Sequence, residues 1–457
     1  MNGGLFKSAS RFALVAAAGI VSGGIAAQAA DLGGNCCADL EERVAELEAT
    51  SARKGNRKVS LTVSGHVNEA IIFWDDGKEQ NAYVVSNENS RTRFRFVGDA
   101  KISADWSAGY LLEISAGYAI SATRNQLAAN SGGNTNTLAI RHSAWWLDNK
   151  QLGRVWVGAT SSATDGITEI NLANVVTSNN DSSNWNGGFL LRNKNGTLAT
   201  GLTWSSIRSH SFNTGEGGRN NVVKYVSPTF AGFTFSAAAG EDDMWDTALR
   251  YAGEFNGIRI AAGVGYKQNY GITGSTNGNC NNTNGAGVIN ATESSVDCNT
   301  IGLSASVMHV PTGIYAMGSW GRLEDKNRQT FVTTAKDNDQ HWFVQAGIEQ
   351  NWFAIGKTTV YGQYLEAENG MSLATGARVS STPLTGGGGL FISDARVTEW
   401  GFGVNQQISA AAMDIYLAYQ HTDAEVRASA TGGQAGAVKL PGVKEWDAIM
   451  AGAIIRF

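Results

Sequence analysis

Proline is nearly absent from this chain. Only 4 of the 457 residues are proline, at Pro228, Pro311, Pro383 and Pro441. Proline lacks the amide donor that a sheet needs, so strand-rich proteins confine it to turns, edges and bulges. Glycine, by contrast, occurs 56 times, and aromatic residues are frequent, with 13 Trp, 12 Tyr and 17 Phe. This composition favours long paired strands over helices.

Long apolar runs and enzyme motifs are missing as well. After residue 30 no stretch reaches the roughly 18 consecutive apolar residues that a membrane-spanning helix requires. The sequence contains no GxSxG, HExxH, P-loop or dinucleotide-binding pattern, and its six histidines are dispersed. We therefore expect no enzyme activity, no metal and no cofactor. The net charge of −5 argues against a nucleic-acid partner.

Residues 1–30 are predicted to be a secretory signal peptide. Lys7 and Arg11 supply its positive region, residues 12–25 its apolar region, and residues 27–30 the small side chains of a cleavage site. A spanning helix is the alternative, but the apolar run is short, rich in Gly and Ala, and ends in this cleavage pattern. The chain is therefore expected to leave the cytoplasm.

Residues 31–56 hold the one clear helical pattern. Leu40, Val44 and Leu47 recur at spacings of four and three, which is typical of a coiled-coil seam. Two heptads are too short to be stable alone. The segment is either a periplasmic coiled coil that joins three chains, or a frayed helix lying against the barrel. Cys36 and Cys37 precede it, and disulfides between chains are one possible role for them.

From Val59 onward apolar and polar residues alternate with a period of two, as in a β-strand with one apolar face and one solvent-exposed face. Residues 57–457 are therefore predicted to form an all-β, 16-stranded antiparallel transmembrane β-barrel. The strands are expected near 57–74, 90–103, 104–121, 137–148, 151–160, 219–228, 229–240, 245–256, 257–270, 299–310, 313–323, 340–352, 357–368, 395–408, 411–424 and 443–457.

The connections between these segments alternate in length, as they do in outer-membrane barrels. Short ones include 148–150, the Asn256-Gly257 hairpin signal and 311–313. Long ones are 161–218, 271–298, 323–339, 369–394 and 425–442. A β-helix would show a short fixed repeat, which is missing here, and a β-sandwich would not need strands of this length.

The sequence resembles the alphaproteobacterial porins, a branch of the general diffusion porins. The resemblance is carried by residues 38–74, by 93–102 and by a barrel pattern that ends in an aromatic residue at Phe457. It implies a homotrimer in the outer membrane of a Gram-negative bacterium, in contact with membrane lipid and lipopolysaccharide. It also implies a third loop folded inward as the pore constriction. The loop at 161–218 is the longest, and 189–207 within it is compatible with a hairpin.

Charged residues at alternating positions predict the pore lining. If the phenylalanines of 90–103 face lipid, the guanidinium groups between them face the lumen, because an arginine in contact with lipid costs about 2–4 kcal/mol near the midplane. The predicted basic wall comprises Arg91, Arg93, Arg95, Arg141 and Arg219, and of these Arg93 and Arg219 match positions that supply constriction arginines in the resembled family. The predicted acidic loop residues are Asp165, Glu169 and Asp181.

Opposed fixed charges across a narrow aqueous gap orient dipolar solutes. The alternative is that these arginines pair with loop acids and only tether the loop. Arg192 and Lys194 lie in the same loop, so the sequence leaves the preference between anions and cations open.

Cys280 and Cys298 enclose 17 residues of an Asn/Gly/Thr-rich loop, which predicts a disulfide contributing about 3 kcal/mol, two free surface thiols being the alternative. The predicted function is passive diffusion of small hydrophilic solutes and ions. A substrate-selective channel and a surface adhesin or envelope tether remain as alternatives.

Overall fold

The computed structural model describes residues 58–127, 137–177, 183–208, 214–240, 243–272, 295–326, 336–369, 372–374, 390–430, 438–439 and 442–457. The predicted signal peptide (1–30) and coiled coil (31–56, with Leu40, Val44, Leu47, Cys36 and Cys37) lie outside these residues, as do Asp181 and Cys280. Within the described residues, no helix is long and apolar enough to cross a bilayer.

Most of the described residues belong to one antiparallel sheet of nineteen strands. Three of these are short. β2 (Gln80–Ser86) and β3 pair with different halves of β1 and together make up one strand position of the barrel. β17 (Ser372–Ala374) pairs with β18, and β20 (Val438–Lys439) pairs with β19. The remaining sixteen are β1 (Thr62–Asp75), β3 (Arg93–Lys101), β4 (Trp106–Gly117), β5 (Thr137–Asn149), β6 (Gly153–Ser161), β9 (Arg219–Val226), β10 (Phe233–Gly240), β11 (Trp245–Phe255), β12 (Ile258–Ile272), β13 (Ser295–His309), β14 (Ile314–Asp325), β15 (Asn338–Phe353), β16 (Gly356–Asn369), β18 (Leu390–Ile408), β19 (Met413–Ala430) and β21 (Trp446–Arg456).

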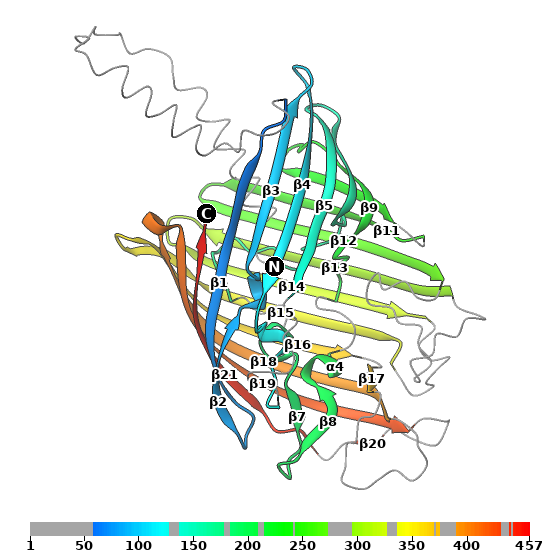
Figure 1. Ribbon diagram of the computed structural model, residues 1–457, viewed down its shortest axis with the longest axis vertical. Coiled ribbons are helices and arrows are strands. Elements are labelled where there is room, and N and C mark those ends of the chain that lie inside the picture. The colour runs from blue at the N-terminus through cyan, green and yellow to red at the C-terminus, as the bar shows by residue number, and fades with distance from the viewer. Residues whose placement is uncertain are drawn as a thin grey trace.

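The sheet closes on itself because β1 pairs with β21 from His66↔Arg456 to Asp75↔Asp447. Figure 1 shows this closure, with β21 beside β1. All sixteen predicted strands are present, so the predicted 16-stranded antiparallel barrel is confirmed. Because the first and last strands pair with each other, neither presents a free edge that could pair with another chain and cause aggregation.

The second strand differs from its predicted form because it is interrupted. The 3-10 helix η1 (Glu88–Ser90) separates β2, which pairs with the later half of β1, from β3, which pairs with the earlier half. The side chain of Asn87 caps η1 by accepting a hydrogen bond from the Asn89 amide. This interruption removes Arg91 from the strand.

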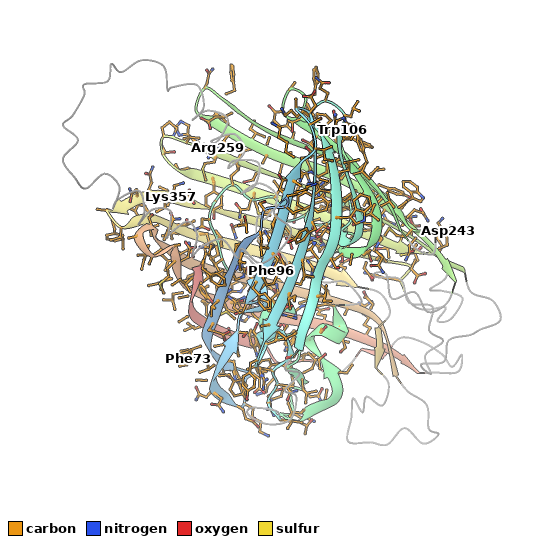
Figure 2. All side chains as sticks on the ribbon, turned by 45° about the horizontal axis from the view of Figure 1, so that its top comes forward. Phe73, Phe96, Trp106, Asp243, Arg259 and Lys357 are labelled. Carbon is orange, nitrogen blue, oxygen red and sulfur yellow. The ribbon has the colours of Figure 1, made fainter. Side chains whose placement is uncertain are left out.

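Side chains alternate between the two faces of the wall, as the period of two predicts. In β1 the residues from Asn68 to Trp74 at even positions are buried, whereas Ile71 and Phe73 face outward and are exposed (Figure 2). A barrel in lipid needs this arrangement, because its outer face must be apolar and its inner face can be wet.

The two ends of the barrel differ, and we call them the short-turn end and the long-loop end. At the short-turn end, β11 and β12 are joined by Asn256 and Gly257, whose φ angles are +48° and +75°. Positive φ at both central residues is the type I′ geometry that matches strand twist, and Asn-Gly adopts it readily. The turn between β13 and β14 contains Pro311 and Gly313, the latter at φ +69°.

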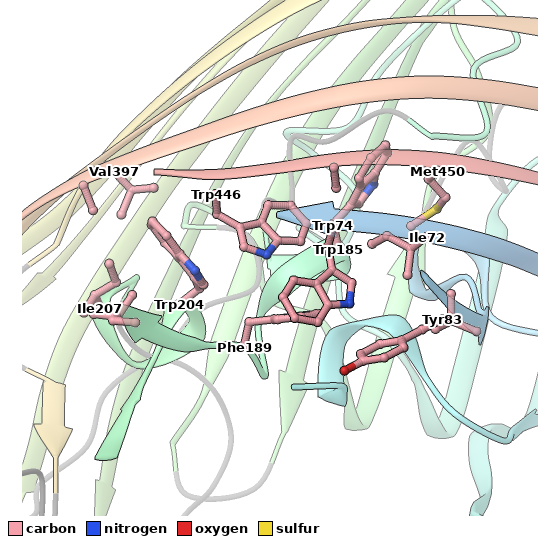
Figure 3. Close-up of a cluster of buried hydrophobic side chains, with 14 of the residues drawn as sticks. Ile72, Trp74, Tyr83, Trp185, Phe189, Trp204, Ile207, Val397, Trp446 and Met450 are labelled. Carbon is pink, nitrogen blue, oxygen red and sulfur yellow. The ribbon is translucent and has the colours of Figure 1, made fainter. Parts of the chain in front are cut away.

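The connection between β6 and β9 carries secondary structure of its own. It contains the helices α3 (Ser183–Asn186) and α4 (Trp204–Ile207) and the hairpin β7 (Leu190–Arg192) with β8 (Leu198–Thr203). Its buried side chains pack with residues of β1, β2, β18, β19 and β21 (Figure 3). Trp74 and Phe189 make an edge-on contact, with ring centroids 5.1 Å apart. The hairpin therefore shares a dry core with the wall.

Candidate functional site: the charged interior of the barrel

Three arginines converge on the inner side of β3, β4 and β5. Arg93 and Arg95 alternate with Phe94 and Phe96 in β3, which gives them a common side of the strand. Arg141 reaches the same place through a β-bulge, since Glu113 of β4 is opposite His142 whereas Ile114 is opposite Ile140. The bulge places Arg141 as an extra residue and turns its side chain inward.

All three guanidinium groups bind the carboxylate of Glu113, which is fully buried. Arg93 Nη1 donates to Oε1 at 3.3 Å, Arg95 Nε to Oε2 at 2.7 Å, and Arg141 Nε to Oε1 at 2.8 Å. The sequence prediction named the arginines and missed Glu113. The alternation of apolar and polar residues could have identified Glu113, because it is the only charged residue between Trp106 and Tyr118 and a charge is expected to face the lumen.

Three guanidinium groups thus meet at one carboxylate. Arg219, the first residue of β9, lies close enough for its charge to act on Arg93 and Arg141. We call these four arginines with Glu113 the basic arc. Arg91 does not belong to it: it lies before β3 and forms an ion pair with Glu88 at 2.7 Å. The interruption by η1 explains this difference.

One of the predicted loop acids, Asp165, lies close enough to Arg219 of the basic arc to interact with its charge. Burial alone would raise the pKa of Asp165, but the charge of Arg219, a hydrogen bond from Ser161 and the charge of Lys224 together lower it. Asp165 is therefore held in its ionised form by these neighbours. Glu169 is buried in the same stretch of the loop.

Glu216, which the sequence prediction did not include, lies at the other end of the loop. It accepts hydrogen bonds from the amides of Gly166 (3.0 Å) and Thr168 (2.6 Å). Burial and the nearby charges of Glu169 and Asp165 raise its pKa well above the usual value for a glutamate. This carboxyl group thus carries a proton under conditions in which Asp165 does not.

Buried charges on the wall hold the base of the loop. Asp246 of β11 accepts hydrogen bonds from the amides of Ala163 (3.0 Å) and Thr164 (2.8 Å). Arg250 of the same strand donates to the carbonyl oxygens of Ala163 (2.8 Å) and Asp165 (2.9 Å). These side chains act as tethers, and no local sequence motif distinguishes them from pore-lining charges.

The loop then continues along inward-facing residues of the opposite strands. Asn171 binds Gln345 of β15 at 2.7 Å. The amide of Asn174 donates to Glu349 of the same strand at 2.8 Å, and its side chain donates to Asp414 of β19 at 2.7 Å. We call the inner face of β13, β15, β16, β18 and β19 the covered arc, because loop residues lie against it.

A buried ion pair secures the later part of the loop to the same arc. Arg208, directly after α4, binds Glu399 of β18, and the two side chains are only 5% and 3% exposed. Arg208 also donates to Asn186 at 2.7 Å and lies 5.7 Å from the ring centroid of Trp204. Arg192, another loop cation, pairs with Asp76 at 2.7 Å. Arg192 and Arg208 are thus compensated locally.

Metal sites and cysteines were considered next in the part of the chain that the structure describes. No group of three or more His, Cys, Asp or Glu side chains there is arranged to hold a metal ion. Cys298 in β13 is disulfide-bonded. Its predicted partner, Cys280, lies outside the described residues, so that pairing stays a prediction.

Comparison with known proteins agrees with this geometry. The sequence profile of the Gram-negative porin family matches residues 13–427. A search of curated proteins finds no match. Among solved structures, the anion-selective porin from Comamonas acidovorans superposes with a TM-score of 0.51 at 14% identity, over 87% of this chain and 100% of that one. Pseudomonas putida OprB, in its high-pH structure, gives 0.51 at 10% identity, over 92% and 97%.

At such low identity these two structures support the fold alone. The family match covers most of the chain and carries the assignment. The chain therefore belongs to the Gram-negative porins, channel proteins rather than enzymes, which form diffusion channels in the outer membrane.

Proposed function

We propose that this porin lets small hydrophilic solutes and ions diffuse passively through a lumen that the loop 161–218 narrows against the basic arc. The observation that carries the proposal is the cluster of three arginines around Glu113 inside a closed barrel, with Arg219 and the loop residue Asp165 close enough to each other for their charges to interact. Fixed charges of opposite sign across an aqueous gap favour hydrated polar solutes over apolar ones.

The same proposal makes the loop the constriction. Its polar bonds to Gln345, Glu349 and Asp414 support a fixed position within the lumen. Because these bonds join the loop to two strands of the wall, β15 and β19, the constriction is expected to stay in place during transport. Gating by movement of this loop is not part of the proposal.

The channel is proposed to be a homotrimer. Several large apolar side chains of β2, β5 and the segment after β4 are strongly exposed: Val84, Tyr118, Leu127, Leu138 and Ile140 are 61–72% exposed. Exposed apolar patches of this kind mark contact surfaces. Glu69, also outward on β1, is a charge that a lipid contact would disfavour.

The residues before the barrel fit the same assembly. The seam of Leu40, Val44 and Leu47 would bring three chains together, with Cys36 and Cys37 beside it. The remaining outer surface would contact outer-membrane lipid and lipopolysaccharide. An alphaproteobacterial source and removal of the signal peptide 1–30 complete the proposal, on the resemblance and the sequence pattern described above.

Liposome swelling tests the diffusion proposal. Purified protein reconstituted into liposomes should make them swell in isotonic solutions of small sugars, at rates that fall as the sugar becomes larger. Liposomes that stay impermeable to the smallest sugars and to salt would contradict the proposal. Light scattering of the detergent-solubilised protein, corrected for bound detergent, should give the mass of three chains, and the mass of one chain would contradict the trimer.

A further inference from the structure

We propose that the loop segment 185–194 is a clamp on the seam of the barrel, the pairing of β1 with β21, and that the barrel opens first at this seam when the clamp is released. The segment binds the first strands and the last strands of the barrel at the same time, at the long-loop end. This inference concerns the closure of the barrel wall and goes beyond the diffusion function proposed above.

The seam is the pairing that joins the two ends of the barrel sequence. It ends with Asp75 opposite Asp447 at the long-loop end, whereas a pair such as β11 with β12 joins neighbours in the chain through a tight turn. Bringing distant residues together costs more chain entropy than closing a short turn. The seam therefore gains more than a hairpin does from contacts that hold its two strands together.

On the side of the first strands, ion pairs and a hydrogen bond hold the clamp. Arg192 pairs with Asp76 at 2.7 Å, and the two side chains are only 2% and 3% exposed. Arg192 also pairs with Glu79 at 3.2 Å. The indole Nε1 of Trp185 donates to the side chain of Asn89 in η1 at 3.0 Å. These contacts fix the clamp to the turn between β1 and β2 and to the break between β2 and β3.

On the side of the last strands, the clamp binds through its main chain. The amide of Lys194 donates to the carbonyl oxygen of Gly442 at 3.0 Å, and the amide of Lys444 donates to that of Arg192 at 2.7 Å. These bonds join β7 to the chain that leads into β21. The Nζ of Lys444 also donates to the carbonyl oxygen of Gly77 at 2.6 Å, so the two sides of the seam meet each other there.

Apolar side chains fill the space between the two sides. Phe189 is fully buried, and its ring centroid lies 5.1 Å from that of Trp74 in β1 and 5.5 Å from that of Trp446 in β21 (Figure 3). Ile72 and Met450, which are opposite each other across the seam, are buried in the same core. The inner face of an outer-membrane barrel is usually polar and wet. Here it is apolar and dry, so the docked clamp and the closed seam depend on one core.

Engineered disulfides across the wall test the clamp on the full-length protein, with the cysteines at 36–37 replaced by serine. Phe73→Cys with Ile449→Cys places two thiols opposite each other across the seam, at exposed positions. The matched control, Leu249→Cys with Val264→Cys, does the same between β11 and β12, at positions that are similarly exposed. Opposite residues of antiparallel strands lie within the Cα separation that a disulfide can bridge.

Two variants release the clamp. Arg192→Gln weakens its hold on the first strands, because Asp76 loses a buried cation. This variant should unfold about tenfold faster than the wild type in hot detergent, measured by the gel mobility of the folded barrel. Phe189→Leu, which stays apolar and loses two ring contacts, should unfold faster as well. The seam disulfide should restore the wild-type rate in both variants, and the control disulfide should not.

Arg208→Gln is the matched control variant, since it weakens another buried ion pair of the loop, with Glu399 of β18, away from the seam. It should respond alike to the two disulfides. Equal rescue of Arg192→Gln by both disulfides, or unfolding of Arg192→Gln and Phe189→Leu at the wild-type rate, would overturn the proposal. Phe189→Leu decides the question if Arg192→Gln does not fold. Unfolding rates give this answer independently of solute diffusion, which liposome swelling reports.

Discussion

The two inner faces of this barrel use the same residue types in different ways. On the basic arc, Arg93, Arg95 and Arg141 share the single carboxylate of Glu113. On the covered arc, Arg208 and Glu399 form a one-to-one pair with almost no exposure. On the basic arc several cations gather around one acid, whereas on the covered arc one cation and one acid fix the loop to the wall. Substitutions on the basic arc should therefore change selectivity, and those on the covered arc should change stability.

The strongest test of this comparison reverses the charge of the basic arc. The double variant Arg93→Glu, Arg95→Glu changes the local charge by four units and should convert the channel to cation preference. The sign of the reversal potential in a salt gradient reports this. A control with Lys150→Glu and Arg259→Glu, which changes surface charge at the short-turn end by the same amount, should retain the wild-type sign. An unchanged potential in the first variant would place both arginines outside the constriction.

Breaking the buried pair of the covered arc should have the second largest effect. Arg208→Ala leaves Glu399 buried without its cation, and removing one partner of such a pair costs about 3–5 kcal/mol. Tryptophan fluorescence during urea unfolding should show the loss, because Trp204 lies beside Arg208. The double variant Arg208→Met, Glu399→Leu removes both charges and should recover most of the stability. Equal stability of Arg208→Ala and the wild type would refute the tethering role.

The disulfide of Cys298 should affect stability without affecting selectivity. Cys298→Ser should lower the free energy of unfolding by about 3 kcal/mol, the value for the 17-residue loop of the predicted pairing with Cys280. Non-reducing peptide mapping should find Cys280 as the partner. A shift in reversal potential on reduction would show that this part of the wall reaches the ion path.

The smallest expected effect is a dependence of selectivity on pH. The pKa of Glu216 is raised by burial and by Glu169 and Asp165. Glu216 is therefore protonated below that raised pKa and adds a negative charge to the loop as the pH rises through it. The chloride-to-potassium permeability ratio of the wild type should decline between mildly acidic and alkaline pH, and it should decline less in Glu216→Gln. The same slope in both proteins would assign the titration to another group.

Alternation and turn chemistry were sufficient to predict the barrel from the sequence. Every predicted strand is present, and Asn256-Gly257 forms the turn that its residues favour. Strands and tight turns are predictable in this way because they depend on residues that are adjacent in the sequence and on the two-residue period of side chains in a strand. The break at η1 was missed, because the cap that forms it is a single Asn87 contact without a distinctive pattern.

The site was less predictable, since partners on different strands depend on register. Alternation placed Arg93 and Arg95 correctly on one side, but only the bulge at Arg141 explains how a third arginine reaches Glu113. The loop path depends on bonds such as Asn174 with Asp414, 240 positions apart in the chain. No local pattern in either residue indicates that contact.

The most direct test of a constriction between the loop and the basic arc is chemical access to single cysteines during current recording. In a background with Cys36→Ser and Cys37→Ser, Arg95→Cys would place a thiol on the basic arc, and Gln345→Cys would place one beneath Asn171 on the covered arc. A negatively charged thiol reagent should reduce the chloride current through Arg95→Cys and leave that through Gln345→Cys unchanged. A current that falls equally in both variants, or only in Gln345→Cys, would contradict the account.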